Sequence, residues 1–189
     1  MTRQELLDKL VRAIAENEGF FVTEAQAKAR KIRFPTRAQI NANPGNLRAW
    51  RDAKGHPYPT GGGYVDFVGW ASYQFPGMSR EEMSHRALEE GWRILRVLAG
   101  QYIDGRYTGG KPPTVEEMFH TYAPSSDGND SAGYARFVAG RLGVRPDQRL
   151  IDLVTALPSG DRERASARVI VRTPDEAVLA VLSESGQSD

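Results

Sequence analysis

One carboxylate in this sequence stands where helical periodicity calls for an apolar side chain. Leu7, Val11 and Ile14 recur at helical spacing, and one further step of four residues reaches Glu18. Gly19 follows, and glycine is typical of a helix end because it adopts positive φ without penalty. We therefore expect Glu18 in the last turn of a helix and partly buried. Burial and the helix dipole both favour the protonated carboxyl, which is the form that a general acid needs near neutral pH.

Two alternatives to this interpretation come from the same stretch. Glu18 could turn out to water or cap a neighbouring loop, in which case it has no chemical role. Glu16 is the nearest rival acid, but it falls off the apolar stripe.

An acid of this kind suits cleavage between two sugars, which also needs stabilisation of an oxocarbenium-like centre. A second carboxylate for that purpose is not evident in the sequence. Asp66, Asp127 and Asp130 are the candidates, although each is better suited to a turn or a helix cap.

The composition is that of an ordinary globular protein. The 189 residues carry a net charge of +1, which argues against a nucleic-acid partner. The chain has no cysteine, which excludes disulfides and thiolate chemistry. His56, His85 and His120 lack metal-ligand spacing, so we expect neither a metal nor another cofactor. A mild basic cluster between Lys28 and Arg37 could touch an anionic polymer, although a solvated helix face is the preferred interpretation.

Helical periodicity and capping signals predict helix over most of the chain. Several expected helices begin with a capping box, in which Ser or Thr is followed three residues later by Glu or Gln. The expected helices are Arg3–Glu18, Glu24–Lys31, Ser79–Tyr102, Thr114–Tyr122, one from Asp130 or Ser131 to Leu142, one beginning at Pro146 and carrying Leu150–Leu157, and a short one over Thr173–Ser183.

The segment Tyr64–Phe75 is rich in aromatic and β-branched residues, which favour a strand. It is predicted to form a short sheet with Leu47–Trp50 across the Gly-rich loop Arg51–Gly63. The stretch Arg33–Asn46 is predicted to be irregular because two prolines interrupt it. The fold class is therefore α+β and predominantly helical.

Four segments, in order along Leu6–Val154, carry a family resemblance. Ile14–Phe20, IAENEGF, and Asn43–Arg48, NPGNLR, resemble the lysozyme-like lytic transglycosylases and muramidases, in particular a phage-associated branch. Glu90-Gly91-Trp92 and the run Tyr122–Ser131, followed by Tyr134, are similar to that branch too.

The resemblance implies a lysozyme-like helical fold with a small sheet lining a cleft, and Glu18 as the catalytic residue. In lytic transglycosylases this Glu acts first as acid and then as base on the bond between N-acetylmuramic acid and N-acetylglucosamine. The N-acetyl group of the muramoyl sugar assists, its C6 hydroxyl attacks, and a 1,6-anhydro product forms without water.

The resemblance also suggests substrate contacts. Asn46 would donate to an acetamido carbonyl from the sheet side, with Tyr73 and Gln74 on the next strand and Tyr122 and Tyr134 on the opposite wall. Tyr, Asn and Gln are apt contacts for sugars, which offer hydroxyls and flat apolar faces. Alternatively, Asn46 only closes a turn, and Tyr134 belongs to the core with its hydroxyl satisfied.

The implied partners are peptidoglycan glycan strands and, for a phage protein, other phage structural proteins, with no membrane or nucleic acid. The N-terminus does not read as a signal peptide, since a capping box and charged residues occupy it. We expect synthesis in the cytoplasm and action on the cell wall, with delivery in a phage particle or by lysis machinery. Residues 1–158 would form the catalytic domain, and 159–189 an extension packed on it.

The chain departs from the family pattern in two respects. It carries the insertions Arg33–Ile40 and Arg51–Gly63, and it lacks the Gly-Leu-Met-Gln segment of cellular transglycosylases. The alternative function is therefore a non-catalytic phage virion or wall-binding protein on the same fold.

Overall fold

The computed structural model describes residues 1–49 and 59–154, which fall within one compact unit. The predicted α+β class, mostly helical with a small sheet, is confirmed. The boundary at residue 158, the extension 159–189, the helix at 173–183 and most of the loop 51–63 lie outside the described residues. The described elements are α1 (Arg3–Asn17), α2 (Glu24–Arg30), α3 (Arg37–Ile40), β1 (Thr60–Gly61), β2 (Tyr64–Val68), α4 (Arg80–Ile103), α5 (Val115–Tyr122), α6 (Ser131–Leu142) and 3-10 turns at Trp70–Ser72, Ser125–Asp127 and Leu150–Leu153.

The capping boxes define where the helices begin. In each box, the Ser or Thr side chain accepts a hydrogen bond from the backbone N–H three residues on. The Glu or Gln side chain at that position accepts one from the backbone N–H of the Ser or Thr. The predicted boxes form at Thr2–Glu5, Thr23–Gln26, Ser79–Glu82 and Thr114–Glu117. Another box, at Thr36–Gln39, begins α3. The prediction that 33–46 is irregular throughout was therefore wrong, because this local signal outweighs the two flanking prolines.

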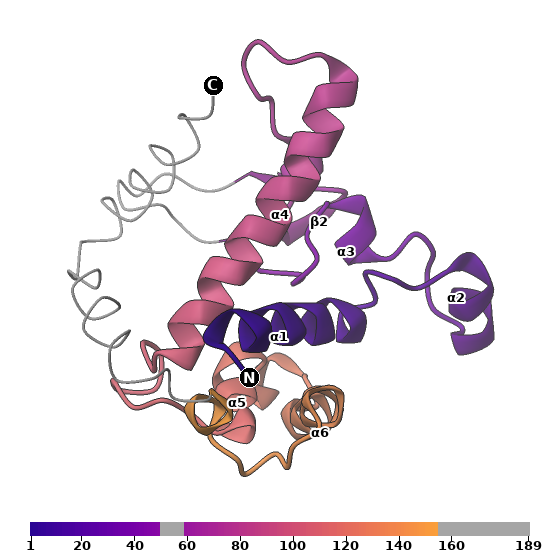
Figure 1. The fold of residues 1–189 in the computed structure, drawn as a ribbon. Helices are drawn as coiled ribbons and strands as arrows, with labels where there is room; N and C mark the ends of the chain where they lie inside the picture. Colours follow the sequence, from indigo (N-terminus) through magenta and orange to yellow (C-terminus); the bar gives the residue numbers. More distant parts are fainter. Residues whose placement is uncertain (50–58, 155–189) are drawn as a thin grey trace. The chain divides into compact units, whose positions relative to one another are not determined.

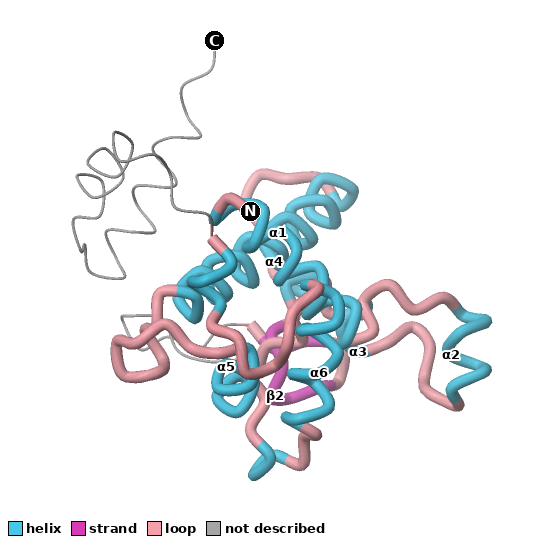
Figure 2. Tube along the Cα trace, turned by 60° about the horizontal axis from the view of Figure 1, so that its bottom comes forward, coloured by secondary structure: helices cyan, strands magenta, loops and turns pink. Residues whose placement is uncertain are grey.

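The core forms where α1 packs against α4 and α6, and α5 packs against α6. Figure 1 shows α1 crossing the lower part of the long helix α4, with α5 and α6 below α1. α2 projects away from this helical body in both Figure 1 and Figure 2. The fully buried side chains of this core include Leu6, Leu10, Ile14, Leu95, Ile103, Met118, Phe119 and Val138.

The small sheet pairs largely as predicted. β1 and β2 are antiparallel, and the backbone of residues 47–49 lies along β2, with Val68 N donating to Leu47 O at 3.0 Å and Ala49 N to Asp66 O at 2.7 Å. The strand stops at Val68, however, and Thr60–Gly61, predicted as loop, is a strand. A 3-10 turn follows β2 because Trp70, only 3% exposed, turns into the core.

No helix forms at Pro146, contrary to the prediction. The carbonyls of Pro146 and Gln148 instead accept hydrogen bonds from Glu116 N at 2.9 Å and Val115 N at 3.1 Å. These are N–H groups of the first turn of α5, which have no partner inside their own helix. The segment thus forms a turn, with Gln148 N donating to Arg145 O at 3.1 Å, that is held against the start of α5, and only the turn Leu150–Leu153 is helical.

Across residues 1–49 and 59–154, every helix falls short of the length and apolarity that crossing a bilayer requires.

Candidate active site

Glu18 is the residue at which α1 ends. Gly19 has φ of +76°, Gly19 N donates to Glu16 O at 3.1 Å, and Phe20 N donates to Ala15 O at 2.9 Å. This pair of bonds is the Schellman arrangement of a helix C-terminus. The predicted placement of Glu18 in the last turn, partly buried, is confirmed.

The turn that follows Glu18 is fixed from outside by α3. Thr36 Oγ1 donates to Gly19 O at 3.1 Å, and the amide of Gln39 donates to Phe20 O at 3.0 Å and Val22 O at 2.9 Å. The capping box of α3 therefore also anchors the end of α1, which restricts the position of the Glu18 backbone.

The carboxyl group of Glu18 is held by two side chains from different parts of the chain. The hydroxyl of Tyr134, on α6, donates to Oε1 at 2.8 Å. The amide of Asn46, in the loop before the sheet, donates to Oε2 at 3.0 Å. Three of the residues predicted for the site are thus brought together, across 28 and 116 positions of sequence.

Burial raises the pKa of the Glu18 carboxyl above its usual 4.5, and it outweighs the opposing effects. The hydrogen bonds from Tyr134 and Asn46 favour the charged form and lower this pKa, as does the positive charge of Arg37. A carboxyl with a raised pKa that stays within reach of two donors can both give up and take back a proton.

Asn46 is positioned by a residue that the sequence interpretation treated only as part of a turn. Asn43 is fully buried, and its amide donates to Leu47 O at 2.9 Å and Val68 O at 3.0 Å. Its side-chain oxygen accepts from Leu47 N at 2.9 Å, and its backbone oxygen from Asn46 N at 2.8 Å. This network, which ties the loop to β2, holds Asn46 with φ of +46°, a conformation that asparagine tolerates better than most residues.

Tyr122 supports the same loop rather than the carboxyl. Its hydroxyl donates to Gly45 O at 2.7 Å. A Cβ on Gly45 would lie 2.7 Å from Leu95 Cδ1 and 3.0 Å from the Tyr122 oxygen, so only glycine lets the loop approach α4 and α5 this closely. The predicted contact between Tyr122 and a substrate stays a prediction; in the structure, the Tyr122 hydroxyl holds the loop that carries Asn46.

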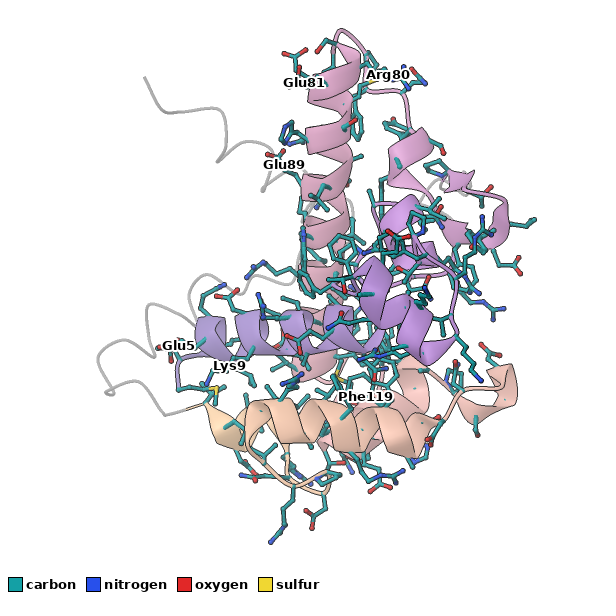
Figure 3. The ribbon with its side chains drawn as sticks, turned by 90° about the vertical axis from the view of Figure 1, so that its right-hand side faces the viewer. Glu5, Lys9, Arg80, Glu81, Glu89 and Phe119 are labelled. Atoms are coloured by element: carbon teal, nitrogen blue, oxygen red, sulfur yellow. The ribbon has the colours of Figure 1, made fainter. Side chains whose placement is uncertain are left out.

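The ring of Tyr134 is fixed by aromatic neighbours. It stacks on Phe119 with centroids 4.3 Å apart and meets Tyr122 edge to face at 5.9 Å. Phe119 is labelled in Figure 3, where it lies close to α6. Burial raises the pKa of both Tyr122 and Tyr134 well above 10, so both hydroxyls stay protonated and act as donors.

Arg37 is a further member of the site that sequence reasoning noted only as part of a basic cluster. Its guanidinium lies over the ring of Phe67 at 3.9 Å and that of Tyr64 at 4.9 Å, both on β2. The guanidinium stacked on these rings is the positive charge that lowers the pKa of the Glu18 carboxyl.

Tyr73 and Gln74 do not lie on a strand, so that part of the prediction was wrong. Both follow the 3-10 turn after β2, both are exposed, and Tyr73 packs edge to face on Phe75 at 4.7 Å. Neither makes a hydrogen bond with Glu18 or its two partners.

The candidate second carboxylates are engaged elsewhere. Arg48 pairs with Asp127 at 2.8 Å and with Asp66 at 3.9 Å. Asp130 caps α6 by accepting from Gly133 N at 2.8 Å, one of the alternatives foreseen for it. Within residues 1–49 and 59–154, no second carboxylate hydrogen-bonds with Glu18, Asn46 or Tyr134.

In the described part of the chain, no group of three or more metal-binding side chains could hold an ion. Comparison with known proteins returns no match among protein-family models, curated proteins or solved structures.

Proposed function

We propose that this protein is a lytic transglycosylase with a lysozyme-like fold that cleaves the β-1,4 bond between N-acetylmuramoyl and N-acetylglucosaminyl residues of peptidoglycan. One observation carries the proposal. The carboxyl of Glu18, at the end of α1, has a raised pKa and is held between Tyr134 and Asn46. The family resemblance of IAENEGF and NPGNLR supports the substrate class, because these segments supply Glu18 and Asn46.

In the first step, protonated Glu18 gives its proton to the glycosidic oxygen as the bond from that oxygen to C1 of the muramoyl sugar breaks. The acetamido oxygen of the same sugar supplies electrons to C1, in place of a protein nucleophile. The resulting Glu18 carboxylate is stabilised by the donors on Tyr134 and Asn46.

In the second step, the Glu18 carboxylate takes the proton of the muramoyl C6 hydroxyl while its oxygen bonds to C1 and displaces the acetamido oxygen. The product is a 1,6-anhydromuramoyl end, and Glu18 is protonated again. One carboxyl suffices for both steps, which accords with Asp66 and Asp127 being paired with Arg48.

A second candidate function is wall binding without cleavage, as a phage virion or cell-wall-binding protein. It is favoured by the fact that both oxygens of Glu18 already have hydrogen-bond partners, as a structural carboxyl would. Under either function, the protein would reach the wall in a phage particle or through lysis machinery.

The test is mass spectrometry of the soluble products that the protein releases from purified sacculi. We expect muropeptides with 1,6-anhydromuramoyl ends. Reducing muramoyl ends would show hydrolysis and contradict the transglycosylase assignment. Sedimentation with sacculi and no released product would favour the binding protein.

A further inference from the structure

A pocket of about 410 Å³ lies next to the candidate active site, between the end of α1, α2 and α6. Its volume falls in the usual range of small-ligand sites, roughly 300–1,000 Å³. Phe21 and Phe137 contribute apolar walls, and Asn17 and Gln26 contribute amides. None of these residues was singled out from the sequence for a binding role.

The charges of this pocket leave one cation without a partner. Glu16 is already compensated twice, by Arg141 at 2.8 Å and by Arg12 at 3.2 Å. The side chain of Arg30, on the other wall, has no ion pair, hydrogen bond or ring contact within the described chain. The pocket is therefore suited to an anion that Arg30 can bind with its planar fork of donors.

The other two guanidinium groups lie over the aromatic walls. Arg141 lies 5.2 Å from the centre of the Phe137 ring, and Arg12 lies 5.0 Å from that of Phe21, which is 42% exposed. The walls thus combine apolar faces, amide groups and positive charge. This combination recognises a short carboxylate-bearing peptide better than a bare sugar, which carries no charge.

The pocket adjoins the site of Glu18 through Asn17, the residue before Glu18 in the chain. Asn17 lines the pocket, and its side chain lies close enough to the Tyr134 hydroxyl to lower the pKa of that group, while the same hydroxyl donates to Glu18. If a sugar bound at Glu18 carried a short substituent, that substituent could therefore enter the pocket. In peptidoglycan, the muramoyl residue carries such a substituent, a peptide stem with free carboxylates.

We propose that this pocket binds the peptide stem of the muramoyl residue at Glu18, with Arg30 binding a stem carboxylate. The inference rests on the proposed function and adds a requirement to it, namely that the enzyme prefers stem-bearing over peptide-free glycan strands.

The test compares binding of two probes, both free of teichoic acid: soluble glycan strands with peptide stems, and the same strands after an amidase has removed the stems. Binding is measured in the Glu18→Gln background so that no strand is cut, and turnover is measured with Glu18 present. Arg30→Gln removes the unpaired cation. Lys28→Gln is the matched control, since Lys28 is also exposed on α2 and has no side-chain partner among the described residues, but lies outside the pocket.

We expect Arg30→Gln to weaken binding of stem-bearing strands about five- to tenfold and to raise KM with little change in kcat, as loss of a charged hydrogen bond at a half-open site would. Binding of peptide-free strands, and all binding by Lys28→Gln, should stay within about twofold of the parent. If Arg30→Gln weakened binding of both probes equally, or of neither, the inference would be overturned. Turnover by the parent protein would in that case leave the proposed function standing. An effect of Arg30→Gln that appears only with teichoic-acid-bearing walls would also overturn it, in favour of a phosphate ligand. No turnover by the parent protein would instead count against the proposed function itself.

Discussion

The Tyr134 hydroxyl donates a hydrogen bond of 2.8 Å to Glu18 Oε1, joining α6 to the end of α1. This bond opposes the effect of burial on the Glu18 carboxyl, since it favours the charged form. Burial and this hydrogen bond together therefore determine the pH range over which Glu18 carries a proton.

Replacing Tyr134 with Phe removes a donor to the carboxylate and leaves the buried surroundings in place. The pKa of Glu18 should rise further, so the alkaline limb of the pH profile of kcat/KM, where the acid loses its proton, should move to higher pH. Rates of muropeptide release at a series of pH values measure this. An alkaline limb at unchanged or lower pH in Tyr134→Phe would contradict the assignment of that limb to Glu18.

Replacing Glu18 with Gln should stabilise the folded protein at neutral pH. The pKa of Glu18 in the folded protein lies above its ordinary value of 4.5. The contribution of the carboxyl group to the free energy of unfolding is therefore fully present below pH 4.5 and is lost as the pH rises through the folded pKa. Gln is neutral throughout, and Asn46 can turn its amide so that its unpartnered Oδ1 accepts a bond from it. The stability gain should grow by about 1.4 kcal/mol for each unit by which the folded pKa exceeds 4.5.

Denaturant titrations of both proteins at about pH 4 and about pH 7.5 measure this difference in unfolding free energy. The gain should be small at the lower pH and larger at the higher one. A Gln variant that is less stable than the parent at both values would mean that the carboxylate is a net stabilising group.

Replacing Asn43 with Ala should destabilise the protein by about 3 kcal/mol, because three hydrogen bonds to buried backbone groups are lost. The matched control is Asn129→Ala, which removes one exposed bond of 3.2 Å to Pro124 O and should cost less than about 1 kcal/mol. Unfolding free energies from denaturant titration provide the comparison. Similar losses in the two variants would show that Asn43 does not hold the Asn46 loop.

Replacing Gly91 with Ala should destabilise by about 1–3 kcal/mol, although Ala is the better helix former. A Cβ at this position in α4 would overlap Ala42 O and come within 2.9 Å of Pro44 Cδ. Gly140→Ala in α6 is the control, since its Cβ would meet nothing within 4 Å, and it should stabilise by up to about 1 kcal/mol. A stabilised Gly91→Ala variant would contradict the close approach of α4 to the loop that carries Asn46.

Features set by local chemistry were predictable from the sequence. Thr2, Thr23, Ser79 and Thr114 begin helices because each is followed three residues later by a partner for its capping box. Glu18 was found because its position on an apolar stripe and the glycine after it are both local signals.

Features set by tertiary contacts were not predictable in this way. The turn at Pro146 is held by N–H groups of the first turn of α5, which have no partner inside their own helix and lie about thirty positions earlier in the chain. Likewise, the turn before Tyr73 exists because Trp70 is buried. Asn43 and Tyr122 act through backbone groups that only the folded chain brings to them.

The most direct test of the central claim is the rate at which soluble muropeptides leave purified sacculi with the parent protein, Glu18→Gln and Glu89→Gln. Glu89, an exposed residue of α4 labelled in Figure 3, controls for loss of a negative charge. We expect 1,6-anhydro muropeptides from the parent and from Glu89→Gln at rates within about twofold, and a fall of at least about 100-fold in Glu18→Gln, since general acid catalysis contributes roughly 10²–10⁴. Equal release by the parent and a folded Glu18→Gln variant would contradict the role assigned to Glu18.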